Sequence, residues 1–115
     1  MDSTMYPPST RELADKRRRL APEPLQAFKK FSAAVFADGA LPHVTKQLIA
    51  VAVAHTTQCP YCIKGHTAEA LKRGATEEQI MEAIWVAAEM RAGGAYAHSA
   101  LALDTMQRVH AHDNT

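Results

Sequence analysis

The sequence predicts an all-α protein of five to six helices that form a single domain. The chain has 115 residues, about the length of one domain, and 47% of them are hydrophobic, enough for a small core. Apolar residues recur at helical spacing, capping patterns separate the apolar stretches, and no stretch alternates as a strand does. We expect a flexible segment at 1–8, the helical domain at 9–110 and a frayed tail at 111–115.

The first two predicted helices precede the chemically distinctive residues. Ser9 and Glu12 have capping-box spacing, so the first helix should begin there and end near Leu20, before two prolines. The second helix should end at Asp38-Gly39, where Gly39 suits the left-handed conformation that closes many helices. This second helix carries an apolar stripe that we expect to be buried: Leu25, Phe28, Phe31, Val35 and Phe36.

The third and fourth helices surround the two cysteines of the chain. Thr45 is the expected N-cap of a helix that ends near Thr57 and is apolar nearly all round, which favours a place in the core or in an oligomer interface. Cys59 precedes a proline and should be the next N-cap, with Pro60 as the first helical residue. Gly74 should close this fourth helix.

The remaining chain predicts two further helices. Thr76 and Gln79 have capping-box spacing and should start the fifth helix. The pair Gly93-Gly94 should divide it from a sixth helix at about 95–109. One side of the fifth helix is apolar and consists of Ile80, Met81, Ile84, Trp85 and Ala88.

Charge and hydropathy exclude several classes of protein. The formal net charge is +1, which gives no general attraction to nucleic acid or to an anionic membrane. The basic run Lys16-Arg-Arg-Arg19 is typical of a solvated helix face. No apolar stretch approaches the roughly 20 residues that span a bilayer, and the N-terminus lacks the pattern of a signal peptide. We therefore expect a cytoplasmic protein with no nucleic-acid or membrane partner.

Cys59 and Cys62 form the most informative motif, and they are the only cysteines of the chain. A free cysteine has a pKa of about 8.5, and a helix N-terminus lowers it. His66 lies four residues after Cys62, on the same face of the predicted helix, where it could carry a proton. The motif therefore indicates a thiol–disulfide redox centre with catalytic residues Cys59, Cys62 and His66.

Two further interpretations of this motif stay open. Cysteines of helical proteins are often small buried hydrophobes without chemistry. A zinc site could use Cys59, Cys62 and His66 with His55 or His98 as the fourth ligand. Structural zinc sites usually draw two ligand pairs from separate segments, so we favour redox chemistry and expect neither a metal nor a cofactor.

Two segments around the motif resemble the carboxymuconolactone decarboxylase family and, more narrowly, its AhpD-like branch of alkylhydroperoxidases. They are 45–66, TKQLIAVAVAHTTQCPYCIKGH, and 70–84, ALKRGATEEQIMEAI, and the resemblance extends over about 25–108. The resemblance implies an AhpD-like helical bundle that assembles as a trimer or hexamer. It also implies that Cys59 and Cys62 cycle between dithiol and disulfide, with His66 in a proton relay. The substrate would be a peroxide or a disulfide, and a thiol or a protein would supply electrons.

The chain departs from that family pattern at two positions. The relay of the family commonly uses a glutamate twelve residues before the first cysteine, where this chain has Gln47, and an amide cannot accept a proton as a carboxylate does. Another acid could replace it, and Glu69 and Glu89 are the candidates. The branch also often has a histidine between the cysteines, where this chain has Tyr61, a candidate wall of the pocket.

The histidines outside the motif are less informative than His66. His55 precedes the motif and either lines the same cleft or packs structurally. His43, His110 and His112 should lie at the surface.

Two functions besides thiol redox catalysis fit the same sequence. The thiols could belong to an oligomeric ligand- or metal-binding module without catalysis. The chain could also decarboxylate a lactone, although the decarboxylases of the family typically lack this cysteine pair.

Overall fold

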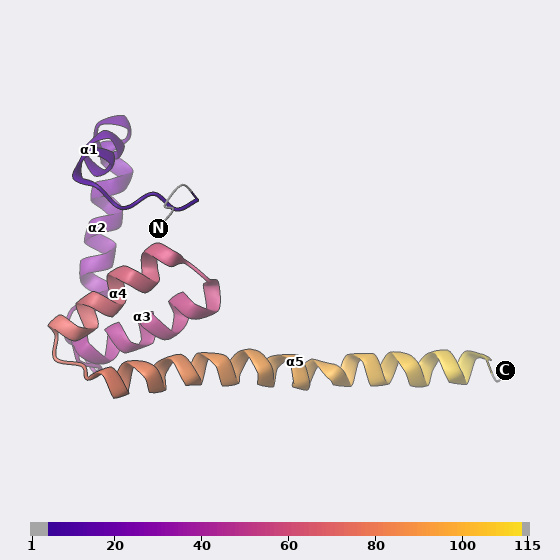
Figure 1. The fold of residues 1–115 in the computed structure, drawn as a ribbon. Coiled ribbons are helices and arrows are strands. Elements are labelled where there is room, and N and C mark those ends of the chain that lie inside the picture. Colours follow the sequence, from indigo (N-terminus) through magenta and orange to yellow (C-terminus); the bar gives the residue numbers. More distant parts are fainter. Residues whose placement is uncertain (1–4, 114–115) are drawn as a thin grey trace.

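The computed structural model describes residues 5–113, and within that range the chain forms five helices and no strand (Figure 1). The all-α prediction is therefore confirmed. The helices are α1 (Arg11–Leu20), α2 (Pro22–Phe36), α3 (His43–Thr57), α4 (Pro60–Lys72) and α5 (Glu77–Asp113).

The core lies where α3 packs against α4 and against the first turns of α5. Val51 of α3 and Ala70 of α4 are fully buried, and Ala75 and Ile80 complete the cluster. Figure 1 shows α1 and α2 on one side of this core and α5 projecting from it in another direction. The molecule is accordingly elongated, with extents of 66 × 35 × 35 Å.

The N-terminal helices differ from the prediction in their cap and in their burial. Thr10, rather than Ser9, caps α1, because its Oγ1 accepts a hydrogen bond from the N–H of Leu13 at 3.2 Å. The apolar stripe of α2 is not buried within the chain, since Phe28 and Phe31 are each 64% exposed. The two ends of the stripe, Leu25 and Phe36, are half-buried, and Phe36 packs against His43 and His66.

A lysine side chain, and not a glycine, completes the C-terminus of α2. The helix ends at Phe36, and Gly39 does not adopt a left-handed conformation, so that prediction is wrong. Lys46 of α3 instead donates from Nζ to the carbonyl oxygens of Val35 and Ala37, at 2.8 and 2.6 Å. A cation at the carbonyl end of a helix also interacts favourably with the helix dipole.

The start of α3 is set by the preceding loop. The Oδ1 of Asp38 accepts a hydrogen bond from the N–H of His43 at 2.7 Å, and the helix begins at that residue. Thr45 lies inside the helix and is not its N-cap, contrary to the prediction. Asp38 satisfies the free N–H of the first helical residue, and α3 therefore begins at His43, two residues before the predicted N-cap Thr45.

The turn between α4 and α5 follows the predicted pattern. Gly74 has a φ of +97° directly after the helix, a conformation that side chains other than glycine rarely adopt. Thr76 and Gln79 form a reciprocal capping box: the N–H of Gln79 donates to Oγ1 of Thr76 at 3.1 Å, and the N–H of Thr76 donates to Oε1 of Gln79 at 2.9 Å. Both predictions are confirmed.

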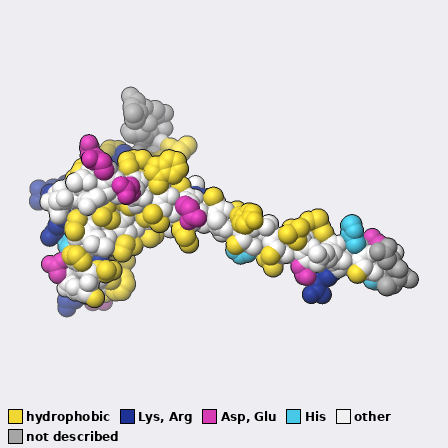
Figure 2. Space-filling view, turned by 90° about the horizontal axis from the view of Figure 1, so that it is seen from below, with side chains coloured by type: hydrophobic (Ala, Val, Ile, Leu, Met, Phe, Trp, Pro, Cys, Tyr) yellow, Lys and Arg dark blue, Asp and Glu magenta, His cyan; other side chains and the backbone are white. Residues whose placement is uncertain are grey.

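The predicted division at Gly93-Gly94 is wrong, because α5 continues through both glycines to Asp113. A glycine inside a helix costs roughly 1 kcal/mol relative to alanine, which is too little to end a long helix by itself. All residues from 95 to 113 are exposed, and they include a set of large apolar side chains visible along the projecting part of α5 in Figure 2. These side chains are Tyr96, Leu101, Leu103, Met106 and Val109.

None of the helices described here, including the long α5, combines the length and the apolar character that crossing a membrane would require.

Candidate functional site

The two cysteines occupy the start of α4, as predicted. Gln58 ends α3 in a left-handed conformation with a φ of 57°, which turns the chain toward the next helix. Cys59 is the N-cap of α4, and its Sγ accepts a hydrogen bond from the N–H of Cys62 at 3.3 Å. Pro60 occupies the first turn, where its missing N–H costs no hydrogen bond. One sulfur thus lies among the free N–H groups of a helix terminus.

The two thiols are free, half-buried and unequal in acidity. Hydrogen bonds from the side chain and the backbone N–H of Cys62 lower the pKa of Cys59 below the ordinary value of a free thiol. The hydrogen bond to Cys59, followed by burial, raises the pKa of Cys62. The two directions have one physical cause, since an S–H of Cys62 that donates to the Cys59 thiolate stabilises charge on one sulfur and a proton on the other. Cys59 is therefore the thiol that ionises first.

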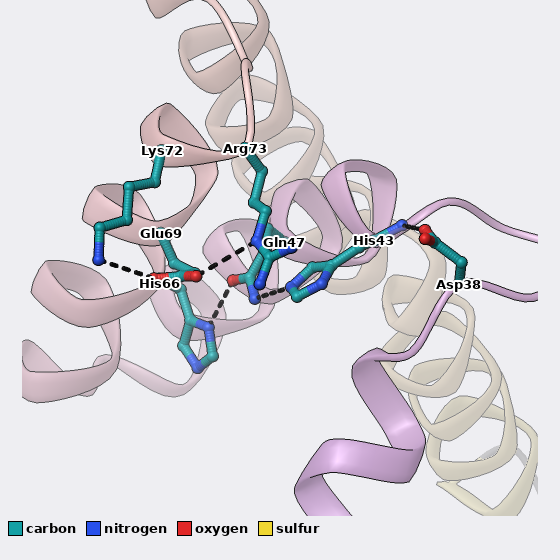
Figure 3. A network of polar contacts seen from close by, with 7 residues as sticks. All are labelled: Asp38, His43, Gln47, His66, Glu69, Lys72 and Arg73. Atoms are coloured by element: carbon teal, nitrogen blue, oxygen red, sulfur yellow. Dashed lines mark hydrogen bonds and ion pairs between the residues drawn. The ribbon is translucent and has the colours of Figure 1, made fainter.

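A buried glutamine joins two histidines beside this helix. Gln47 of α3 is 3% exposed, and its Oε1 lies 2.8 Å from Nδ1 of His66 on α4. Its Nε2 lies 2.9 Å from Nε2 of His43, one turn earlier on α3 (Figure 3). The ring of Phe36 from α2 stacks on His66, with centroids 5.4 Å apart and an interplanar angle of 21°, and also contacts His43. Three helices therefore fix the position of the His66 ring.

An open cavity of ≈ 490 Å³ connects this network to one of the cysteines. Its walls include Cys62, His66, Gln47, Tyr61 and Glu69. Cys62 and His66 share it because they lie four residues apart on the same face of α4. Within residues 5–113, however, no hydrogen bond joins His66 to either sulfur, so any proton exchange would need a small movement or an intervening molecule.

The two carboxylates considered as replacements for a relay glutamate lie in different places. Glu69 of α4 lines the cavity, but its carboxylate is 3.4 Å from Nε of Arg73 and 4.0 Å from Nζ of Lys72 (Figure 3). Glu89 lies on an exposed part of α5, beside Gly93. Neither acid is bonded to His66, and Glu69 is the one that faces the same cavity.

Tyr61 lines the cavity as predicted and also holds the N-terminal segment. Its hydroxyl donates to the carbonyl oxygen of Pro7 at 2.7 Å, and its ring meets that of Tyr6 edge to face at 6.2 Å. The residue between the two cysteines therefore links the site to a part of the chain before α1. The first four residues of the segment predicted to be flexible, and the last two of the tail, lie outside the described residues.

The remaining predicted histidines lie apart from this cavity. Nδ1 of His55 bonds to the carbonyl oxygen of Val51 at 2.8 Å, within its own helix, and His55 is not a wall of the cavity. His98 makes the same kind of bond to Gly94 on α5. Across residues 5–113, no three side chains of histidine, cysteine, aspartate or glutamate lie together as a metal ion would require.

His43 is the residue of this site that sequence reasoning missed. It was expected at the surface, but it is partly buried, contacts Phe36 and binds Gln47. A signal was present, because His43 lies four residues before Gln47 and so occupies the same face of a helix. With a helix that begins only after Thr45, His43 lies outside the helix and its position relative to Gln47 cannot be deduced.

Comparison with known proteins identifies a family whose model covers most of the helical part of the chain. Residues 22–105 match the model of the carboxymuconolactone decarboxylase family. Uncharacterized protein 4 in the cox locus of Paracoccus denitrificans is 66% identical over 83 residues, which cover 72% of this chain and 75% of that protein. An uncharacterized protein of Haemophilus influenzae is 42% identical over 83 residues, covering 72% and 74% of the two chains.

Solved structures show the same fold. A carboxymuconolactone decarboxylase family protein from Legionella pneumophila has a TM-score of 0.67 and 35% identity, covering 84% of this chain and 87% of its own. A protein from Methanobacterium thermoautotrophicum has a TM-score of 0.68 and 38% identity, covering 72% and 93%. With most of its helical domain matched in both sequence and structure, the chain belongs to the carboxymuconolactone decarboxylase family.

Proposed function

We propose that the protein is a thiol-dependent oxidoreductase of the AhpD-like type, which reduces a peroxide or a disulfide through Cys59 and Cys62. The observation that carries the proposal is the cap of α4: Cys59 Sγ accepts the N–H of Cys62 at 3.3 Å, and the two thiols have opposite pKa shifts. A helix terminus that stabilises one thiolate beside a second thiol is the usual arrangement of a reactive cysteine pair. Free thiols of this kind can close a disulfide reversibly.

The first step is an attack by the Cys59 thiolate on the substrate. With a hydroperoxide, a bond forms between this sulfur and the outer oxygen, the O–O bond breaks, and the alkoxide takes a proton from water. Cys59 is then a sulfenic acid, and one molecule of alcohol has left. The lowered pKa of Cys59 supports its role as the attacking thiol, because only the thiolate is an effective nucleophile.

The second step closes the disulfide. Cys62 gives its proton to His66, which lines the same cavity, and its sulfur attacks Cys59. The S–S bond forms as the hydroxyl of the sulfenic acid leaves with a proton as water. Two thiols and one hydroperoxide thus give one disulfide, one alcohol and one water, and an external thiol donor supplies two electrons to restore the pair. A disulfide substrate would be reduced to two thiols by the same pair.

The exposed apolar surfaces support assembly of several copies, as a trimer or hexamer. Tyr96 on α5 is 82% exposed and Trp85 is 67% exposed, while Phe28 and Phe31 on α2 are each 64% exposed. Large apolar side chains that gather at an exposed surface usually mark a protein–protein interface. Light scattering coupled to size-exclusion chromatography should give three or six times the mass of the chain, and a monomer at micromolar concentration would contradict this part of the proposal.

Steady-state turnover tests the proposed activity. We expect the wild-type protein to reduce an organic hydroperoxide, or a small disulfide, with dithiothreitol as the donor. Cys59→Ser and Cys62→Ser should each abolish turnover, and His66→Ala should slow it by about a hundredfold, the usual effect of losing a general acid–base group. The exposed substitution Ser99→Ala on α5 serves as a control that should match the wild type. Full activity in the double variant Cys59→Ser, Cys62→Ser would refute the proposal.

A further inference from the structure

The Gln47 side chain faces one ring nitrogen of each of two histidines, and its two ends are chemically different. Oε1 can only accept a hydrogen bond, and it lies 2.8 Å from Nδ1 of His66. The NH₂ group can only donate, and it lies 2.9 Å from Nε2 of His43. The His66 nitrogen must therefore carry a hydrogen, whereas the His43 nitrogen must present a lone pair.

These two contacts determine the tautomers of both rings. A neutral imidazole has one N–H and one bare nitrogen, so a hydrogen on Nδ1 of His66 leaves its Nε2 free to accept a proton. Figure 3 shows this second nitrogen pointing away from Gln47. His43, by the same reasoning, is bare at Nε2 and carries its hydrogen on Nδ1.

The amide couples the two rings, because its oxygen and its NH₂ group exchange places together when it turns over. If the amide turned over, NH₂ would face His66 and the oxygen would face His43, and both rings would have to exchange tautomers together. Gln47 is only 3% exposed, so water cannot easily replace a lost bond at either end. The nitrogen that His43 presents and the nitrogen that His66 presents are thus linked through the orientation of the amide.

We propose that His43 is a positioning residue: by accepting a hydrogen bond from Gln47, it holds His66 in the tautomer whose Nε2 can take the proton of Cys62. This inference rests on the proposed role of His66 as proton carrier. It also gives Gln47 a function that does not require a carboxylate, because an amide held in one orientation fixes the base without itself accepting a proton.

The surroundings of His43 support a fixed ring. Asp38 Oδ1 binds its backbone N–H at 2.7 Å, and Phe36 contacts the ring face at a centroid distance of 5.9 Å. The nearby cation of Lys46 is bound to two carbonyl oxygens at the end of α2. On α4, Glu69 shares the cavity with His66 but is paired with Arg73. Each neighbouring charge therefore has a partner other than the two imidazoles.

The test is the tautomer of His66, measured by nitrogen NMR of the histidine rings in the full-length protein at a pH where both rings are neutral. In the wild type we expect the hydrogen on Nδ1 of His66 and on Nδ1 of His43. This measurement requires no substitution. A neutral His43 that carries its hydrogen on Nε2 would overturn the proposal.

Two variants separate positioning from a simple packing role. His43→Phe keeps a flat ring beside Phe36 but removes the acceptor, so His66 should become a mixture of both tautomers. His43→Gln restores an acceptor at similar reach and should restore the single tautomer. His110→Phe, at the exposed end of α5, is the matched control. If His66 stays entirely in the Nδ1–H form in a folded His43→Phe protein, the proposal is wrong.

Turnover rates of the same variants link the tautomer of His66 to catalysis. They also distinguish the proposed redox activity from the proposed positioning role of His43. We expect His43→Phe to lower the rate of disulfide closure by about tenfold with little change in KM, and His43→Gln to recover most of it. A wild type that shows the expected tautomers but no turnover would refute the proposed function and leave the positioning intact. Turnover that is unchanged in His43→Phe despite a mixed tautomer would overturn the positioning role.

Discussion

Replacing Gln47 by glutamate tests whether the carboxylate common in the family relay is what this site lacks. The two imidazole nitrogens lie 2.8 and 2.9 Å from the amide, so a carboxylate in the same place would accept hydrogen bonds from both rings. His43 would have to turn its facing nitrogen into a donor. His66 would keep its Nδ1 hydrogen and would be favoured in its protonated form, because a negative charge would lie beside it.

The magnitude follows from the strength of these bonds. A hydrogen bond to a charged group contributes roughly 1.5–3 kcal/mol, against about 1 kcal/mol for a neutral one. The imidazolium that forms when His66 takes the proton of Cys62 is therefore stabilised by about 0.5–2 kcal/mol, which favours this proton transfer roughly two- to thirtyfold. Burial of the new carboxylate at a position only 3% exposed opposes ionisation and reduces this gain. We expect Gln47→Glu to raise peroxide turnover by about tenfold.

The assay is the initial rate of organic hydroperoxide reduction with dithiothreitol as donor, compared at equal thiol content. Gln26→Glu adds the same charge at an exposed position of α2 and should leave the rate unchanged. If Gln47→Glu is folded but no faster than the wild type, while Gln26→Glu equals the wild type, then the carboxylate is not the missing element. The amide would then be the working form of this residue in this chain.

Three further results are expected. Val51→Ala should lower the free energy of unfolding by about 2 kcal/mol, since Val51 is fully buried in the core, and a loss below about 0.5 kcal/mol in urea unfolding would argue against that core. Thr76→Ala should cost about 1 kcal/mol by removing one half of the capping box, and unchanged thermal unfolding would contradict it. Cys62→Ala removes the side-chain hydrogen bond that is the largest cause of the lowered pKa of Cys59, so the pH midpoint of its alkylation should move up toward the ordinary value of a free thiol; an unmoved midpoint would show that backbone N–H groups suffice.

Local features of the fold could be predicted because their physics is contained within a few residues. The caps formed by Cys59 and Thr76 depend on hydrogen bonds that span three residues, and both were found as expected. The predicted helix end at Gly93-Gly94 is absent, because the free-energy cost of glycine in a helix is too small to end a helix of 37 residues. A local sequence pattern is reliable where its side chains form capping hydrogen bonds. It is weak where it changes only the helix propensity of a residue.

Features that depend on distant contacts could not be predicted in the same way. The contact between Gln47 and His66 joins residues 19 positions apart, on two helices whose packing is set by the core. The apolar stripe with Phe28 was correctly recognised as apolar, yet its burial requires a surface that the described part of one chain does not supply. The sequence indicated several residues that line the cavity, among them Cys62 and His66, whereas the contact of His43 with Gln47 depends on the three-dimensional arrangement.

The proposed chemistry requires that Cys59 and Cys62 form a reversible redox pair. The most direct measurement is thiol titration and intact mass of the reduced protein before and after one equivalent of hydroperoxide. We expect that both thiols disappear together, that the mass falls by two hydrogen atoms through an internal disulfide, and that dithiothreitol restores both. Two thiols that remain free, or oxidation of a single cysteine to sulfinic or sulfonic acid without a disulfide, would contradict it.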